Sequence, residues 1–252
     1  MKHYIKISAL IISLLLLTNC NKENSSKEDQ KPQPSQKVNF WVGDTTNYIH
    51  GIDVSHHQDT INWDEVKNFG VTFVFVKATE GIDYLDTMFT HNWQNIEKVN
   101  MIRGAYHFYE SDDDPIQQAK WFIDNVKSFD GVLPPVIDVE RAGHEKVTIE
   151  EYQKKLEILL NEVERLTGRQ PLIYSSPNFA AKYLGDNTFG KYKLWIAEYG
   201  VDEPKIPSAW QTEGWHFWQD SFQATVPGVP KQVDRNRYAG KYSDLVGLVI
   251  KQ

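Results

Sequence analysis

Cysteine is almost absent from this chain, and basic residues are not in excess. Among 252 residues there is one cysteine, Cys20, so no disulfide can form within the chain. The 27 lysines and arginines are outnumbered by 34 aspartates and glutamates, which gives a formal net charge of −7. A nucleic-acid-binding protein usually carries an excess of basic charge, so we expect no nucleic-acid partner.

Motifs for cofactors and for activated nucleophiles are also missing. The sequence has no glycine-rich phosphate loop and no Ser–His–Asp elbow motif. His56, His57 and His107 do not have the spacing of metal ligands. We therefore expect neither a cofactor nor a metal ion.

The first twenty residues have the pattern of an export signal. Two lysines precede a mostly apolar run, Ile7–Leu17, that is too short to span a bilayer comfortably. The run ends in LTNC, which resembles a bacterial lipobox, although Asn19 departs from the usual Gly, Ala or Ser. The sequence predicts a lipoprotein signal peptide at residues 1–19 and a lipid-modified Cys20. The alternative is a plain signal peptide with an incidental cysteine.

A polar segment follows Cys20. Residues 21–37 read NKENSSKEDQKPQPSQK and contain no apolar residue that could anchor a core. We predict a disordered tether over residues 20–46 and one folded domain over residues 47–252. Together with the anchor, this organisation predicts an extracytoplasmic protein held on a membrane by lipid, with the leaflet left open.

Within the folded domain, strand and helix patterns alternate. Helices are indicated at 61–70, near 86–100, from Asp114-Pro115 onward, from a capping box at Thr148 to Gly168, and briefly after 176. Strands are indicated at 48–55, 71–81, 102–109, 134–140, 171–176, 193–200, 214–221 and 231–238. Five βα units followed by three β-strands predict an α/β fold, an irregular TIM-like barrel. A doubly wound open sheet is the second choice.

The stretch PPVIDVE, residues 134–140, places two carboxylates in an apolar strand. Side chains at i and i+2 point to the same side, so Asp138 and Glu140 face the barrel axis together with Val136. Asp53 faces inward by the same alternation. Acids at the carboxyl ends of barrel strands suit glycosidic bond cleavage, in which one protonates the leaving oxygen. The alternatives are salt bridges with barrel lysines and a metal site.

A series of motifs resembles the glycoside hydrolase family 25 lysozymes. They cover about residues 48–240 in the family's order and read GIDVSHHQ, INW, FVFVKATEG, GAYHFY, PPVIDVE, IYSS, LWIAEY, FWQ and VDRNRY. The resemblance implies an irregular barrel of five βα units and three further strands. It also implies cleavage of the bond from N-acetylmuramic acid to N-acetylglucosamine in peptidoglycan.

The resemblance further implies roles for the acids. Glu140 would be the general acid/base, and Asp138 would orient or stabilise the substrate's N-acetyl group as it attacks the anomeric carbon, giving net retention. Asp53 and Asp234 would complete an acidic floor. Strand geometry places the Cα atoms of Asp138 and Glu140 ~6.6 Å apart, which does not by itself separate a direct nucleophile from neighbouring-group participation.

Other matching positions are candidates for substrate binding. Lys77 and Glu80 lie at the end of the second strand, and either bind substrate or form an ion pair that supports the barrel. Aromatic rings stack on the apolar faces of sugars, although each ring could equally pack in the core. The candidate pocket walls are Tyr106, Tyr174, Trp195, Tyr199 and Trp218.

The sequence thus predicts a monomeric, lipid-anchored muramidase whose partners are peptidoglycan glycan strands and the membrane. Two other functions stay open: a catalytically silent cell-wall glycan-binding lipoprotein and a glycosidase of chitin-type chains. Turnover of purified peptidoglycan distinguishes an enzyme from the silent binding protein. The sugar found at the new reducing end distinguishes a muramidase from the chitin-type glycosidase.

Overall fold

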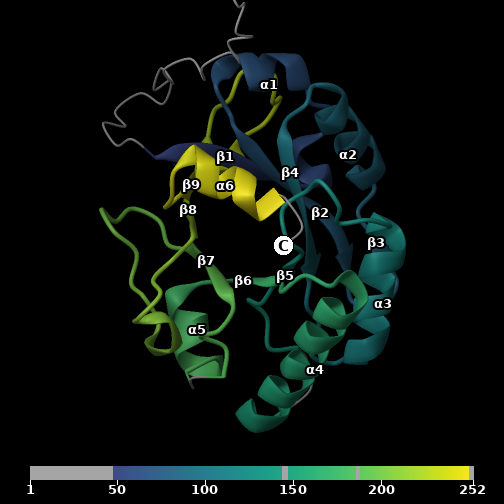
Figure 1. The fold of residues 1–252 in the computed structure, drawn as a ribbon, viewed down its shortest axis with the longest axis vertical. Helices are drawn as coiled ribbons and strands as arrows, with labels where there is room; N and C mark the ends of the chain where they lie inside the picture. Colours follow the sequence, from purple (N-terminus) through teal and green to yellow (C-terminus); the bar gives the residue numbers. More distant parts are fainter. Residues whose placement is uncertain (1–47, 144–146, 186–187, 250–252) are drawn as a thin grey trace, which may run out of the picture. The chain divides into compact units, whose positions relative to one another are not determined.

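The structure, a computed structural model, describes residues 48–143, 147–185 and 188–249, and the predicted signal peptide and tether lie outside these ranges (Figure 1). β1 pairs with both β2 and β9, so the sheet closes into an eight-stranded barrel, to which β3 is added beside β2. The predicted irregular barrel is confirmed, and the open sheet is wrong. The strands are β1 (Ile49–Val54), β2 (Phe73–Glu80), β3 (Tyr84–Leu85), β4 (Ile102–Phe108), β5 (Val136–Asp138), β6 (Leu172–Ser175), β7 (Lys193–Ala197), β8 (Phe217–Ala224) and β9 (Val233–Tyr238).

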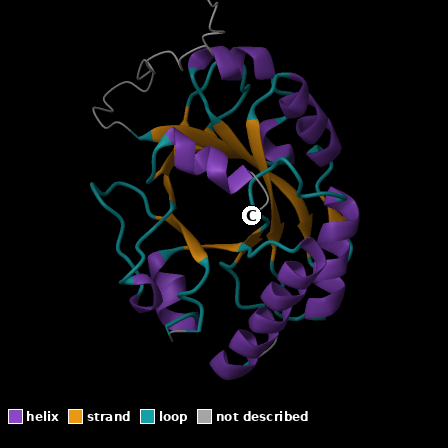
Figure 2. Cartoon of the chain, viewed as in Figure 1, coloured by secondary structure: helices purple, strands orange, loops and turns teal. Residues whose placement is uncertain are grey.

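Helices lie outside the first five parallel barrel strands (Figure 2). Their ends follow local chemistry: Asp114 caps the helix that starts with Pro115, and the predicted capping box joins Thr148 to Glu151. Gly168 ends the longest helix in the left-handed conformation, as expected of a C-terminal glycine. The helices are α1 (Trp63–Phe69), α2 (Phe89–Lys98), α3 (Pro115–Val126), α4 (Ile149–Thr167) and α5 (Pro177–Tyr183), with 3₁₀ turns η1 (His56–Gln58) and η2 (Ser208–Trp210).

Two apolar layers follow from the alternation of side chains along each strand. Residues such as Ile137 and Val139 belong to the outer layer beneath the helices. The inner layer fills the barrel with aromatic rings, and the Phe75 ring stacks on Trp195 at 4.3 Å between centroids. A Cβ atom at Gly51 would lie 2.4 Å from the Phe73 ring, so glycine makes room for this packing. The barrel interior is therefore a packed core, and a cavity lies near each of its ends.

The last strand runs against its neighbours. The sequence suggests a parallel barrel, but β9 is antiparallel to both β8 and β1. The connection from Ala224 to Val233 contains no helix, and a short connection of this kind can only reverse the chain. The reversal brings the start of β9 to the carboxyl end of β1, where Asp234 is the direct partner of Asp53.

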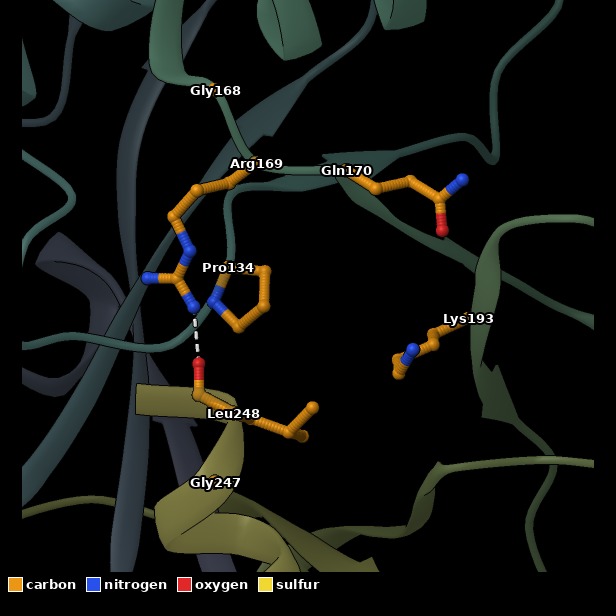
Figure 3. Close-up of a pocket in the computed structure, with 7 residues that line it drawn as sticks. All are labelled: Pro134, Gly168, Arg169, Gln170, Lys193, Gly247 and Leu248. Carbon is orange, nitrogen blue, oxygen red and sulfur yellow. Dashed lines mark hydrogen bonds between the residues drawn. The ribbon is translucent and has the colours of Figure 1, made fainter. Parts of the chain in front are cut away.

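A helix that the sequence analysis missed closes the other end of the barrel. In α6 (Tyr242–Val249), Leu245 is fully buried and belongs to the inner aromatic layer. Arg169 holds this helix, because its guanidinium donates a hydrogen bond to the Leu248 carbonyl oxygen (Figure 3). The same guanidinium donates to the carbonyl oxygens of Phe129 and Val132. A hollow of about 250 Å³ beside Arg169 is lined by Pro134, Gly168, Arg169, Gln170, Lys193, Gly247 and Leu248 (Figure 3). No helix in the described ranges is long and apolar enough to cross a membrane.

Candidate active site

Four carboxyl groups converge on one cavity at the carboxyl ends of the parallel strands. Asp53 lies on β1, Asp138 ends β5, Glu140 follows two residues later, and Asp234 is the second residue of β9. The cavity measures about 290 Å³ and is lined by Asp53, Tyr106, Asp138, Glu140, Tyr174, Trp195, Tyr199, Gln219, Phe222 and Asp234. The structure thus brings together all four acids that the sequence analysis singled out.

Asp53 is buried at the floor of the cavity and is held by two amides. Its Oδ2 accepts hydrogen bonds from Gln219 Nε2 and from Asn236 Nδ2, each at 2.8 Å. The amides are themselves oriented, because Tyr174 donates to Gln219 Oε1 at 3.0 Å and Trp195 donates to Asn236 Oδ1 at 2.8 Å. Burial raises the pKa of Asp53, and the hydrogen bonds from the two amides act against that rise.

Asp234 forms a proton-sharing pair with Asp53. Burial, the charge of Asp53 and a hydrogen bond to it raise the pKa of Asp234 to about 8. Asp234 therefore carries a proton at neutral pH and donates it to the Asp53 carboxylate. Two carboxyl groups this close cannot both ionise cheaply, so the pair carries one negative charge at neutral pH.

Asp138 is also buried but has fewer partners. Its Oδ1 makes no hydrogen bond to any residue that the structure describes. Burial and the nearby charge of Glu140 raise its pKa well above the ordinary value, while Lys77 acts in the opposite direction. A buried oxygen without a partner is costly, and such groups are concentrated at functional sites. Asp138 also lines the cavity, so its carboxyl can accept a hydrogen bond from a molecule bound there.

Glu140 is the accessible acid of the group. The residue is exposed at the mouth, yet desolvation by the surrounding walls and the charge of Asp53 raise its pKa. Lys77 and Arg141 oppose that rise. A carboxyl group that is reachable and has a raised pKa can donate a proton to a bound molecule and later take one back.

Lys77 and Glu80 form an ion pair beside the cavity instead of lining it. Lys77 Nζ lies 2.6 Å from Glu80 Oε2, and Arg141 Nη1 lies 3.6 Å from Glu80 Oε1. Lys77 favours the charged forms of both Asp138 and Glu140. The geometry is that of an ion pair that supports the barrel, and its lysine acts to lower the pKa values of Asp138 and Glu140.

Two of the three histidines considered in the sequence, His56 and His107, hydrogen-bond to neighbouring side chains. His56 Nδ1 lies 2.7 Å from Asp86 Oδ2. His107 is buried between Thr79 and Gln118, and burial lowers its pKa to about 4. In the part of the chain that the structure describes, no group of three His, Cys, Asp or Glu side chains is arranged to hold a metal ion.

Comparison with known proteins settles the family. The model of glycosyl hydrolases family 25 matches residues 52–229, which include Asp53, Asp138 and Glu140 and end before Asp234. The chain belongs to this family.

Relatives and solved structures agree with the family 25 assignment. Protein YegX of Escherichia coli (strain K12), which is uncharacterized, is 35% identical over 80% of this chain and 73% of its own length. Lysozyme M1 of Streptomyces globisporus is 33% identical over 81% of this chain and 72% of its own. The bacterial lysozyme of Streptomyces coelicolor is 32% identical, covers 82% of this chain and 98% of its own, and superposes with a TM-score of 0.77.

The structure places four of the five aromatic residues proposed as pocket walls around the cavity of this family 25 domain. Tyr106, Tyr174, Trp195 and Tyr199 line the cavity, but Trp218 does not. Its neighbours on β8, Phe217 and Gln219, face inward, so alternation turns Trp218 outward into the layer beneath the surface. There it is buried, and its indole N–H donates to the Glu198 carbonyl oxygen at 2.8 Å.

Two residues that line the family 25 cavity, Gln219 and Phe222, were missed from the sequence, and so was Asn236, which donates a hydrogen bond to Asp53. Gln219 and Asn236 were detectable, because Gln219 follows the inward Phe217 by two positions and Asn236 follows Asp234 by two. Phe222 was not detectable by counting, because the pairing of β8 with β9 shifts between Gln219 and Ser221.

Proposed function

We propose that this protein is a muramidase that hydrolyses the β-1,4 bond between N-acetylmuramic acid and N-acetylglucosamine in peptidoglycan. The observation that carries the proposal is the contrast within one cavity between an accessible acid with a raised pKa, Glu140, and a buried carboxyl with a free acceptor oxygen, Asp138. Membership of family 25 and the 33% sequence identity to lysozyme M1 support the proposal.

In the first step, the carbonyl oxygen of the muramic acid's N-acetyl group attacks the anomeric carbon as the glycosidic C–O bond breaks. Glu140 gives its proton to the departing N-acetylglucosamine oxygen. Asp138 accepts a hydrogen bond from the acetamido N–H. The positive charge that develops on that group favours the charged form of Asp138, which stabilises it in return.

In the second step, water attacks the anomeric carbon and reopens the ring that the acetamido group had formed. Glu140, now a carboxylate, takes the proton from the water, so the enzyme returns to its starting state. The two attacks each invert the anomeric centre, which gives net retention. The single negative charge shared by Asp53 and Asp234 stabilises the oxocarbenium-like centre from the cavity floor.

Mass spectrometry of peptidoglycan digested by the purified protein tests this proposal. A muramidase leaves N-acetylmuramic acid at the new reducing end. N-acetylglucosamine at that end would instead indicate the chitin-type alternative, and an undigested wall that still binds protein would indicate the silent one. NMR of the first product is expected to show the retained anomer; the inverted anomer would exclude the acetamido mechanism and leave Asp138 or Asp53 as the base for water.

We also propose that residues 1–19 are a lipoprotein signal peptide and that residues 20–46 tether a monomeric domain to the outside of a membrane. The support is the position of Cys20, the chain's one cysteine, at the end of LTNC. Cys20→Ala is expected to abolish acyl labelling, because the proposed acyl chains are all attached to that residue. The protein should then leave the membrane fraction, since these chains are its proposed anchor. Labelling that survives the substitution would exclude this anchor.

A further inference from the structure

Two aromatic side chains are exposed side by side at the rim of the cavity. Phe222 is 52% exposed and Tyr199 is 41% exposed, and their ring centroids lie 5.0 Å apart at an interplanar angle of 61°. Both residues line the cavity that contains the four acids. Among the described residues the only other exposed aromatic side chain is Tyr242, on α6. Exposed aromatic surface is therefore concentrated at the site.

An irregularity in β8 turns Phe222 toward the cavity. Gln219 pairs with Asn236, and the next paired residue, Ser221, is opposite Arg235, so Asp220 is an extra residue on the β8 side. An extra residue of this kind is a β-bulge, which shifts the alternation of side chains by one. Phe222 thereby acquires the inward direction of Asp234.

Tyr199 is held in place before any ligand binds. Its hydroxyl donates to Gln219 Oε1, the same amide that binds Asp53. The preceding residue, Glu198, donates its backbone N–H to the Gln219 carbonyl oxygen at 3.2 Å and accepts from the Trp218 indole. Because these contacts fix Tyr199, little conformational entropy is lost when its ring is covered.

We propose that Tyr199 and Phe222 form a platform on which one pyranose ring of the glycan strand stacks, beside the sugar at which cleavage occurs. This assignment rests on the proposed function. A pyranose presents an apolar face of C–H groups, which matches two rings without a formal charge. The strand beyond the cavity is thereby directed over β7 and β8, away from the ion pairs of Lys77, Glu80 and Arg141 on the other side.

The test measures binding of soluble, peptide-free glycan strands from peptidoglycan in a Glu140→Gln background, which prevents turnover. Phe222→Leu keeps apolar volume and removes the ring, and we expect it to raise Kd about 3- to 10-fold. Phe222→Trp restores a ring and is expected to return Kd close to that of Phe222. Ile116→Ala is the matched control, because Ile116 is 53% exposed on α3, outside the cavity.

An unchanged Kd for Phe222→Leu would overturn the platform, and so would an equal loss in Ile116→Ala. A loss of affinity accompanied by a lower melting temperature that Phe222→Trp does not rescue would assign Phe222 a structural role instead. The outcome is separable from the proposed function. If binding depends on Phe222 but the unsubstituted protein does not cleave peptidoglycan, the muramidase proposal is wrong and the platform stands. If the unsubstituted protein cleaves peptidoglycan but binding does not depend on Phe222, the platform is wrong and the muramidase proposal stands.

Discussion

Two pairs of carboxyl groups share one cavity, and their surroundings differ. Asp53 and Asp234 form a closed arrangement on β1 and β9, in which one proton is shared and two amides fill the remaining acceptor positions. Asp138 and Glu140 form an open arrangement after β5, with one oxygen unpartnered and one carboxyl exposed. The closed pair finds its partners within the protein, whereas in the open pair one Asp138 oxygen has no partner among the described residues and Glu140 faces solvent.

The difference shows how one residue type can serve several purposes in one cavity. Burial raises the pKa of all four acids, so burial alone does not distinguish them. The four acids are distinguished by their hydrogen-bond partners and by their access to solvent. Amide donors such as Gln219 favour the charged form of Asp53, while access to solvent lets Glu140 exchange protons with a substrate. Substitutions in each pair should therefore have distinct effects.

The largest effect is expected in the open pair, from Glu140→Gln. The amide keeps the shape but cannot cycle a proton, so kcat/KM on peptidoglycan should fall about 10²- to 10⁴-fold. The defect should shrink on a synthetic glycoside with a good leaving group, which hardly needs protonation. Glu150→Gln, an exposed glutamate in the first turn of α4, is the control and should leave activity unchanged.

Asp138→Asn should lower kcat/KM about 10²- to 10³-fold, because the amide cannot take on the negative charge that the developing positive centre favours on Asp138. Every substrate needs that charge, so the defect should persist whatever the leaving group. Both variants are to be measured on both substrates, with folding checked by thermal melting. If the better leaving group rescued Asp138→Asn and not Glu140→Gln, the two roles would have to be exchanged.

The smallest effect is expected in the closed pair, from Asp234→Asn. Below pH 8 the amide can donate to Asp53 as the protonated acid does, so activity should change less than about tenfold. A loss as large as that of Glu140→Gln would mean that the closed pair takes part in proton transfer.

The same variant also tests the shared proton through stability. In the unfolded chain Asp234 ionises near pH 3.8, whereas in the folded protein it keeps its proton up to about pH 8. Between these values the folded state binds more protons, so this group makes the free energy of unfolding fall as pH rises. Melting temperatures measured from about pH 5 to about pH 8 should therefore fall less in Asp234→Asn than in the unsubstituted protein. Parallel curves would contradict the shared proton.

Much of the fold could be predicted because it depends on local patterns. Alternation along PPVIDVE gave the inward direction of Asp138, and the spacing of Thr148, Glu151 and Gly168 gave both ends of α4. These features depend on neighbours within a few residues, so a single sequence contains the information needed to predict them.

The remaining features depend on contacts between distant segments. The direction of β9 follows from which strands it joins, and α6 is stabilised by the barrel interior that buries Leu245. Trp218 lies in the outer layer because it alternates with the inward Phe217 and Gln219. Phe222 was missed because the pairing of β8 with β9 shifts twice, and the shift between Gln219 and Ser221 changes the side-chain alternation just before Phe222.

The sealed base of the barrel has a consequence for how a polymer can be cut. Aromatic rings fill the interior and α6 covers the far end, so a sugar chain cannot thread through the protein. On the proposed platform of Tyr199 and Phe222 at the rim, the strand lies across the mouth with both of its ends outside. A strand bound in this way is cut at internal bonds, so we expect endo-acting, non-processive cleavage. Size analysis early in digestion should show fragments of many lengths; a product dominated by terminal disaccharides would contradict this expectation.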